Sequence, residues 1–286
     1  MNYFSPNKIR EFEQANRCRI EIAHFSSNEK LLNRLTEGES ADVLVPSTYM
    51  RKILAEQGRI CGFKAAGADQ LAVPYLRGIS GLGWSVDRPP PDSPCSWGWV
   101  AGAKTRSATM LDDVRETLGA GLKFLGYSAN SVSESEVRQA ASLVQEWKQG
   151  LAGFESEYYK VGLIAGEYDI VHGYSGDLFQ AFSKYPNLRF SLPMEGALMS
   201  TDELCVSAES KNKELAASFI DFQTSPTALQ EHASYTGFQR VDDDAFIVPK
   251  GVPDSTKAAF EKSEEIASIG EVQDFWIELW REIRKD

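Results

Sequence analysis

The 286 residues carry 41 acidic and 30 basic side chains, which gives a formal net charge of -11 and an isoelectric point of about 4.9. This charge argues against a nucleic-acid-binding protein, because phosphate contacts require clustered Lys and Arg. No apolar run approaches the roughly 18–20 residues of a membrane-spanning helix, and residues 1–6 lack the basic and apolar regions of a signal peptide. The length suits one large domain or two lobes.

The first part of the chain alternates helical patterns with apolar runs. Helices are expected over residues 7–17, 28–35 and 49–57, and strands over 19–25 and 41–45. This alternation predicts an α/β protein with a mixed, mostly parallel sheet. Ligands of such sheets bind beyond the carboxyl ends of the strands. Ser47 and Tyr49 follow the strand over 41–45 and are therefore candidate ligand contacts.

An apolar approach over 107–111 leads into an acidic stretch that ends at Glu116. Apolar residues recur every four positions from Val114, so a helix is expected to begin here. Acidic side chains in its first turn have a simple structural explanation, because they cap free N–H groups and complement the helix dipole. Asp113 and Glu116 also share one helix face, where two carboxylates could hold a cation.

The later elements continue the α/β pattern, and none of their motifs predicts catalysis. Residues 173–176 lie between a predicted strand and a predicted helix, but a hydrolase elbow needs G-x-S-x-G and the second glycine comes one position early. The glycines of 78–83 do not fit a dinucleotide loop. The four cysteines lack metal-binding spacing and are expected to be free thiols. We therefore expect no enzyme, no metal and no cofactor, with a hydrolase using Ser175 as a weak alternative.

A set of polar and aromatic residues falls at strand ends and helix starts in both halves of the chain. Carboxylates pair with ammonium groups, and tyrosine rings attract cations and cover methylene groups. The set therefore suits a long cation with a methylene backbone in a cleft between two lobes, although each member alone has an ordinary structural explanation. Its members are Tyr3, Ser47, Tyr49, Asp113, Glu116, Tyr174 and Asp202.

An ordered series of short pieces resembles the spermidine/putrescine-binding proteins of bacterial ABC importers. The pieces include 42–49, 111–116, 174–176, 193–197 and 211–214. The resemblance implies a two-lobed, type II periplasmic binding fold and a periplasmic location. It also implies a polyamine or related cationic amine as ligand, and ABC permease subunits as partners. We expect a monomer that does not bind nucleic acid.

The resemblance also gives each acidic candidate a place in the family. Asp113 and Glu116 match the acids that bind one end of the polyamine, and Asp202 matches an acid near the second crossing between the lobes. Asp112 and Arg115 are then local structural charges.

The remaining candidates match the hydroxyl and aromatic positions of the family. Ser47 and Tyr49 match residues of the first lobe, and Tyr3 matches a tyrosine of its first loop. Tyr174 stands where the family usually has a tryptophan. The expected lobes are 1–86 with 202–250, and 87–201 with 251–286.

The departures from the family concern its aromatic residues and its beginning. Arg77 and Ser200 stand where aromatic residues are common, and Ile266 where some members have a polar contact. The family's first strand would lie upstream of Met1, so the chain is expected to be N-terminally truncated. The alternative hypothesis is a degenerate binding-fold scaffold or sensor domain with a different small ligand or none.

Overall fold

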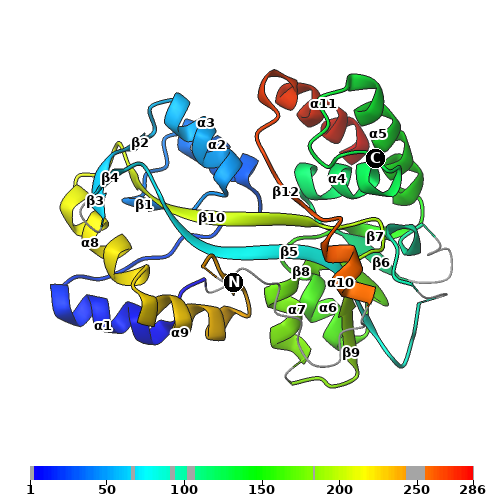
Figure 1. Ribbon diagram of the computed structural model, residues 1–286, viewed down its shortest axis with the longest axis horizontal. Coiled ribbons are helices and arrows are strands. Elements are labelled where there is room, and N and C mark those ends of the chain that lie inside the picture. Colours follow the sequence, from blue (N-terminus) through cyan, green and yellow to red (C-terminus); the bar gives the residue numbers. More distant parts are fainter. Residues whose placement is uncertain are drawn as a thin grey trace. The chain divides into compact units, whose positions relative to one another are not determined.

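The computed structural model describes residues 3–65, 68–90, 94–101, 107–182, 184–242 and 255–285 (Figure 1). The chain forms two compact units. Unit 1 comprises Met1–Arg77 and Ser200–Ala245, and unit 2 comprises Gly78–Met199 and Phe246–Asp286. The chain passes from one unit to the other within strands β5 (Val73–Ser85) and β10 (Leu198–Ser207). Each unit is therefore assembled from segments that are far apart in the sequence.

The strands of unit 1 gather around its parts of β5 and β10. Strands β1 (Val43–Leu44) and β2 (Ile60–Cys61) pair antiparallel with β10, and β11 (Gln239–Arg240) pairs antiparallel with β5. Strands β3 (Phe63–Ala65) and β4 (Ala68–Gln70) form a separate two-stranded sheet. The helices are α1 (Pro6–Asn16), α2 (Asn28–Thr36), α3 (Thr48–Glu56), α8 (Lys213–Gln223) and α9 (Pro226–Thr236). Figure 1 shows α2 and α3 on one side of β1, and α1 and α9 on the other.

Local signals explain where the first two helices begin. Ser5 caps α1 by accepting the Asn7 N–H, and Pro6 occupies the first turn, where its missing N–H costs nothing. Ser27 caps α2 in the same way by accepting the Lys30 N–H at 3.3 Å. These helices lie within about two residues of their predicted ranges.

Residues 19–25 form no strand, contrary to the prediction from their alternating pattern. Ile22 is 41% exposed, and no strand within the described residues pairs with this segment. The Ile20 N–H instead donates to a Glu13 carboxylate oxygen at 2.7 Å. An alternating pattern fits a strand, but a strand also needs a neighbour for its backbone groups.

The sheet of unit 2 combines parallel and antiparallel pairs. Strand β6 (Ala108–Met110) lies between β7 (Leu151–Phe154) and β8 (Ile170–Tyr174) and is parallel to both. Strand β5 is antiparallel to β8 and to β9 (Leu188–Ser191). Strand β12 (Glu264–Glu265) runs parallel to β10.

The mixed sheet is confirmed, but its pairs are not mostly parallel as the sequence predicted. Parallel neighbours require a long crossover. Helices α4 (Val114–Phe124) and α5 (Glu134–Lys148) provide one between β6 and β7, and α6 (Tyr159–Ala165) lies between β7 and β8. No helix precedes β5 or β10 directly in the chain, and each of these strands has antiparallel neighbours.

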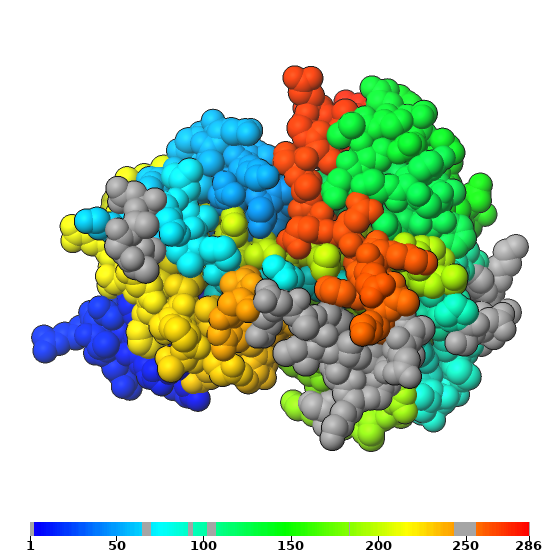
Figure 2. Space-filling model, in the orientation of Figure 1, coloured from blue at the N-terminus to red at the C-terminus, as the bar shows by residue number. Residues whose placement is uncertain are grey.

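Three helices of unit 2 pack together through regularly spaced apolar faces. Figure 2 shows α11 (Gln273–Arg284), in red, against the green residues of α4 and α5.

Helix α7 (Ser175–Phe182) packs against β8 and β9. Within the described ranges, no helix combines the length and apolarity needed to cross a membrane.

The unit boundaries fall after residues 77, 199 and 245, whereas the sequence placed the crossings after 86, 201 and 250. The first difference is the largest. Residues 80–85 belong to unit 2 because they pair with β8 and β9, and a strand's partners are not visible in its own sequence.

All four cysteines are free thiols, and one buried thiol lies in each unit. Burial raises the pKa of Cys95 in unit 2 well above its usual value, and the Glu195 charge adds to the effect. In unit 1, burial raises the pKa of Cys205 to about 12, with a further contribution from Glu203. Both thiols are therefore held in their neutral form.

Gly173 permits the close contact between β8 and α6. A methyl group at this position would lie 2.3 Å from Cε2 of Tyr159, whose side chain is 1% exposed. The Tyr159 hydroxyl donates to Asp177 Oδ2 at 2.6 Å. The ring is therefore held from the far end as well, and it cannot move away from β8 without breaking that bond.

We expect Gly173→Ala to lower the free energy of unfolding by about 1–3 kcal/mol, because the packed ring must shift. Urea denaturation measures this loss. Gly153→Ala on β7 is the matched control, since a methyl group there meets no atom within 4 Å. We expect the control to stay within about 0.5 kcal/mol of the wild type. Equal losses in the two variants would contradict the role given to Tyr159.

Candidate functional site

The seven candidate residues fall into two sets, one in each compact unit. Unit 1 holds Tyr3, Ser47, Tyr49 and Asp202, and unit 2 holds Asp113, Glu116 and Tyr174.

In unit 1, three candidates that are far apart in the sequence converge. The Tyr3 hydroxyl donates a hydrogen bond to Asp202 Oδ2, 199 residues away in the sequence. Ser47 and Asp202 form an isolated antiparallel bridge, and the neighbouring Glu203 N–H donates to the Pro46 carbonyl at 2.8 Å. The backbone after β1 therefore brings a serine hydroxyl beside a carboxylate that already accepts from a tyrosine.

Tyr49 lies apart from this bridge and contacts an acid that the site prediction omitted. Its ring is 2% exposed, and its hydroxyl donates to Glu29 Oε1 at 2.9 Å. The adjacent Asn28 accepts the Ser47 N–H at 3.0 Å. Residues 28 and 29 begin α2, so their acidic and amide groups looked like ordinary helix-start residues.

Two buried oxygen atoms of this region have no hydrogen-bond partner among the described residues. They are Ser47 Oγ and Glu29 Oε2. Buried polar atoms without a partner are costly. A hydroxyl and a carboxylate oxygen can both accept from an ammonium group, so a cationic ligand would satisfy them.

Aromatic rings enclose Tyr3. Its ring centroid lies 5.6 Å from those of Tyr75 and Phe238. Burial raises the pKa of Tyr75 well above its usual value, and the nearby Asp202 charge raises it further. The Tyr75 hydroxyl therefore stays protonated and donates to the Tyr3 carbonyl at 2.9 Å.

In unit 2, Asp113 performs the capping role that its position predicts. One carboxylate oxygen accepts from the N–H groups of Arg115 and Glu116, at 2.9 and 3.1 Å. The Asp113 side chain is 5% exposed, so α4 begins with a buried negative charge. The helix dipole and these two N–H groups stabilise that charge.

The two neighbouring charges have separate structural partners. Asp112 pairs with Arg284 at 2.8 Å. The Arg115 guanidinium is buried and donates to the Ala267 carbonyl and to Asn130 Oδ1, each at 2.9 Å. These contacts join α4 to the C-terminal part of unit 2.

Glu116 approaches the face of the unit 2 sheet on which the strand register places Tyr174. Ser80 lies opposite Tyr174 in the β5–β8 register, and its hydroxyl donates to Glu116 Oε2 at 2.6 Å. His172 precedes Tyr174 by two residues and therefore shares its face of the strand. Glu116 is 2% exposed, so a second buried carboxylate joins this face.

A short chain of hydrogen bonds fixes the backbone of Tyr174. Its N–H donates to the Tyr159 hydroxyl at 3.3 Å, and that hydroxyl donates to Asp177. Lys160 binds the other Asp177 oxygen at 2.8 Å. Burial raises the pKa of Tyr159 well above its usual value, with the Asp177 charge as the next cause, so the hydroxyl keeps its proton.

The environment of Ser175 does not resemble that of a catalytic serine. Its side chain is 1% exposed and accepts the Ile79 N–H at 3.4 Å. His172, the histidine three residues before it, has no hydrogen-bond partner on either ring nitrogen within the described residues. A serine nucleophile needs an adjacent base.

His172 is a neutral group beside Glu116. Its side chain is fully buried, and burial lowers its pKa from the usual 6.5 to about 3. Its Nε2 lies 3.8 Å from Glu116 Oε2, which is too long for a hydrogen bond, and the Trp97 ring centroid lies 4.8 Å from its own. Since the unfolded chain binds a proton at a higher pH, stability falls as the pH drops below 6.5.

We expect His172→Leu to keep the free energy of unfolding at pH 7.5 within about 1 kcal/mol of the wild type, because the buried nitrogens that it removes have no hydrogen-bond partner in the described part of the chain. We also expect a weaker loss of stability between pH 6.5 and 4. Urea denaturation at several pH values measures both. The exposed His24→Leu is the control and should keep the wild-type pH dependence. A loss above about 2 kcal/mol at pH 7.5 would show that the nitrogens are bonded.

The chain is similar to curated proteins and to solved structures. The chain is 27% identical over 254 residues to the putrescine/cadaverine-binding protein of Pseudomonas aeruginosa, covering 77% of this chain and 72% of that protein. It is 26% identical over 257 residues to the spermidine/putrescine-binding periplasmic protein of Salmonella typhimurium, covering 82% and 74%. The solved Tp0655 lipoprotein of Treponema pallidum matches with a TM-score of 0.82 and 24% identity, covering 99% and 96%.

These solved and curated relatives confirm the predicted α/β fold of periplasmic binding proteins. Residues 30–246 match the family model described as bacterial extracellular solute-binding protein. Because this match covers well over half of the chain, the protein belongs to the bacterial extracellular solute-binding proteins.

Proposed function

We propose that this protein captures a polyamine such as putrescine or spermidine, or a related cationic amine, and delivers it to the permease subunits of an ABC importer. The observation that carries the proposal is the burial of Asp113 and Glu116 at one helix start, 5% and 2% exposed. A buried carboxylate attracts an ammonium group more strongly than an exposed one, because less water screens its charge. The names of the relatives from Pseudomonas aeruginosa and Salmonella typhimurium agree with this ligand class.

Two neighbours of Glu116 are compatible with a cationic ligand, because Ser80 is a neutral donor and His172 is uncharged at neutral pH. An ammonium group bound to the Glu116 carboxylate would form charge-assisted hydrogen bonds, which are stronger than neutral ones. The ring of Tyr174, on the same sheet face, would cover the methylene groups beside it.

The unit 1 set supports the same ligand class. Asp202 supplies a carboxylate, and Ser47 and Glu29 supply buried oxygen acceptors. The rings of Tyr3 and Tyr49 supply apolar and cation-attracting surface. We propose all seven predicted residues as ligand contacts and add Glu29 as a neighbour of Tyr49.

Binding and transport, rather than catalysis, follow from membership of the family, so the protein is not an enzyme. We propose a periplasmic location, as for the Salmonella typhimurium relative, and a monomeric protein. We further propose that the two compact units are the two lobes of the fold. The net charge of -11 supports an amine rather than nucleic acid as partner.

We expect Asp113→Asn to weaken putrescine binding by roughly 10- to 100-fold, because it removes one charge from the site. Asparagine caps a helix about as well as aspartate, so the free energy of unfolding should change by less than about 1 kcal/mol. Isothermal titration calorimetry measures the Kd. Asp112→Asn is the matched control, because its partner is Arg284, and it should bind as the wild type does.

The outcomes separate the site from the function. Wild-type affinity in Asp113→Asn would remove Asp113 from the site. A wild-type protein that binds neither putrescine, cadaverine nor spermidine would overturn the proposed function and favour a scaffold or sensor with a different ligand or none.

A further inference from the structure

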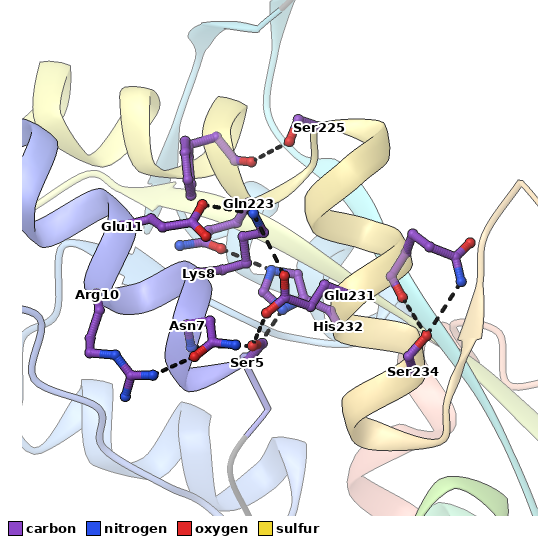
Figure 3. A network of polar contacts seen from close by, with 12 residues as sticks. Ser5, Asn7, Lys8, Arg10, Glu11, Gln223, Ser225, Glu231, His232 and Ser234 are labelled. Carbon is purple, nitrogen blue, oxygen red and sulfur yellow. Dashed lines mark hydrogen bonds and ion pairs between the residues drawn. The ribbon is translucent and has the colours of Figure 1, made fainter.

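The N-terminal segment, defined as residues 3–5, is held at both ends before α1 begins. The Tyr3 carbonyl accepts from the Tyr75 hydroxyl at 2.9 Å. The Ser5 N–H donates to His232 Nδ1 at 2.9 Å, and the Ser5 hydroxyl donates to Glu231 Oε1 at 2.5 Å (Figure 3). These contacts tie the segment to β5 and to α9.

His232 is held in one tautomer and one orientation. Its side chain is fully buried, and its Nδ1 accepts a backbone N–H, so its proton must lie on Nε2. That Nε2 lies 2.8 Å from Gln223 Oε1, which accepts the proton's hydrogen bond (Figure 3). The rings of Phe4 and Tyr75 pack against the imidazole at 5.6 and 5.5 Å between centroids. The imidazole therefore presents a fixed acceptor to one backbone group.

The same segment carries a candidate ligand residue. Tyr3 lies two residues before the anchored N–H, and its hydroxyl donates to Asp202. Between these two contacts the chain has little freedom, because the Tyr3 carbonyl is also held. The position of the Tyr3 ring therefore depends on the anchors of the segment.

We propose that His232 is a positioning residue for the Tyr3–Asp202 pair. By accepting the Ser5 N–H it fixes the N-terminal segment, and the segment holds the Tyr3 hydroxyl on Asp202. The consequence for ligand affinity rests on the proposed function, whereas the anchoring of the segment does not.

Loss of the His232 acceptor would first release the N-terminal segment. Ser5 is 3% exposed, and an apolar side chain at position 232 would leave its buried N–H without a partner. Such a group costs about 1–3 kcal/mol. Residues 3–5 belong to no helix or strand, so this short segment can avoid that cost by detaching into water. Detachment would withdraw Tyr3 from Asp202.

Burial, rather than the surrounding charges, keeps His232 neutral at physiological pH. Burial lowers its pKa to about 4, whereas the Glu231 charge raises it and the Lys8 charge lowers it. Tyr75, the other titratable group against the ring, stays protonated. As the pH falls towards 4, a proton on Nδ1 would face the Ser5 N–H, and the anchor would be lost.

Hydrogen exchange tests the anchoring without any ligand. We expect His232→Leu to raise the exchange rate of the Ser5 amide about tenfold, from the loss of one buried hydrogen bond. His232→Asn, whose side-chain oxygen can replace Nδ1 as acceptor, should restore most of the protection. Leu229→Ala on the same helix is the control for a general loss of stability through a cavity. When the two variants are compared at the same free energy of unfolding, the Ser5 amide should exchange more slowly in Leu229→Ala than in His232→Leu.

A double-mutant cycle tests the effect on the site. We expect His232→Leu to weaken putrescine binding about tenfold in the wild-type background and to have little further effect in a Tyr3→Phe background. Additive losses would contradict the proposal, because His232 would then act independently of Tyr3. Calorimetry on the four proteins measures the cycle.

Hydrogen exchange and the double-mutant cycle together distinguish failure of the positioning role from failure of the proposed function. Unchanged Ser5 exchange in His232→Leu would overturn the positioning role. A wild type that binds no putrescine, with Ser5 exchange that rises in His232→Leu, would overturn the function and keep the anchoring. If His232→Leu does not fold, exchange of the Ser5 amide in the wild type at pH 7 decides instead, and exchange as fast as that of an unprotected amide overturns the anchor.

Discussion

The backbone ladders along β5 and β10 are the constraint on which both sets of site residues depend. Each strand belongs partly to unit 1 and partly to unit 2, and each has hydrogen-bonded neighbours in both. Within unit 1, β5 supplies Tyr75, which holds the Tyr3 carbonyl. Within unit 2, the same strand supplies Ser80, which binds Glu116. Asp202 lies on β10 and forms the bridge to Ser47. Regular pairing of two strands therefore sets the positions of side chains that the local sequence leaves undetermined.

Buried charge is handled differently in the two units. In unit 2, Asp113 is stabilised by two backbone N–H groups and a helix dipole, and Glu116 accepts from a hydroxyl. In unit 1, Asp202 accepts from a tyrosine hydroxyl whose position depends on a histidine. In both units, neutral hydrogen-bond donors help to hold the carboxylates in place. A neutral donor fixes a carboxylate without adding a positive charge, which suits the recognition of a cation.

Local signals in the sequence predicted the helices and the acidic helix start well, whereas contacts between residues far apart in the sequence could not be predicted from it. The cap at Asp113 needs only its own turn of helix, and it was foreseen. Residues 19–25 have the alternation of a strand but lack a neighbour to pair with. His232 contacts Ser5 across 227 positions of sequence, and no local pattern marks it. Glu29 was overlooked because an acid in a first helical turn has a sufficient explanation without a ligand.

The two buried thiols give the molecule a reporter in each unit. Cys95 and Cys205 are both enclosed and held protonated, so an alkylating reagent can modify them only when the surrounding structure opens. Since one lies in unit 2 and the other in unit 1, the rates at which they are modified would follow the opening of each unit separately. The native chain could thus show whether a bound solute slows the breathing of both halves or of one alone, without an introduced label.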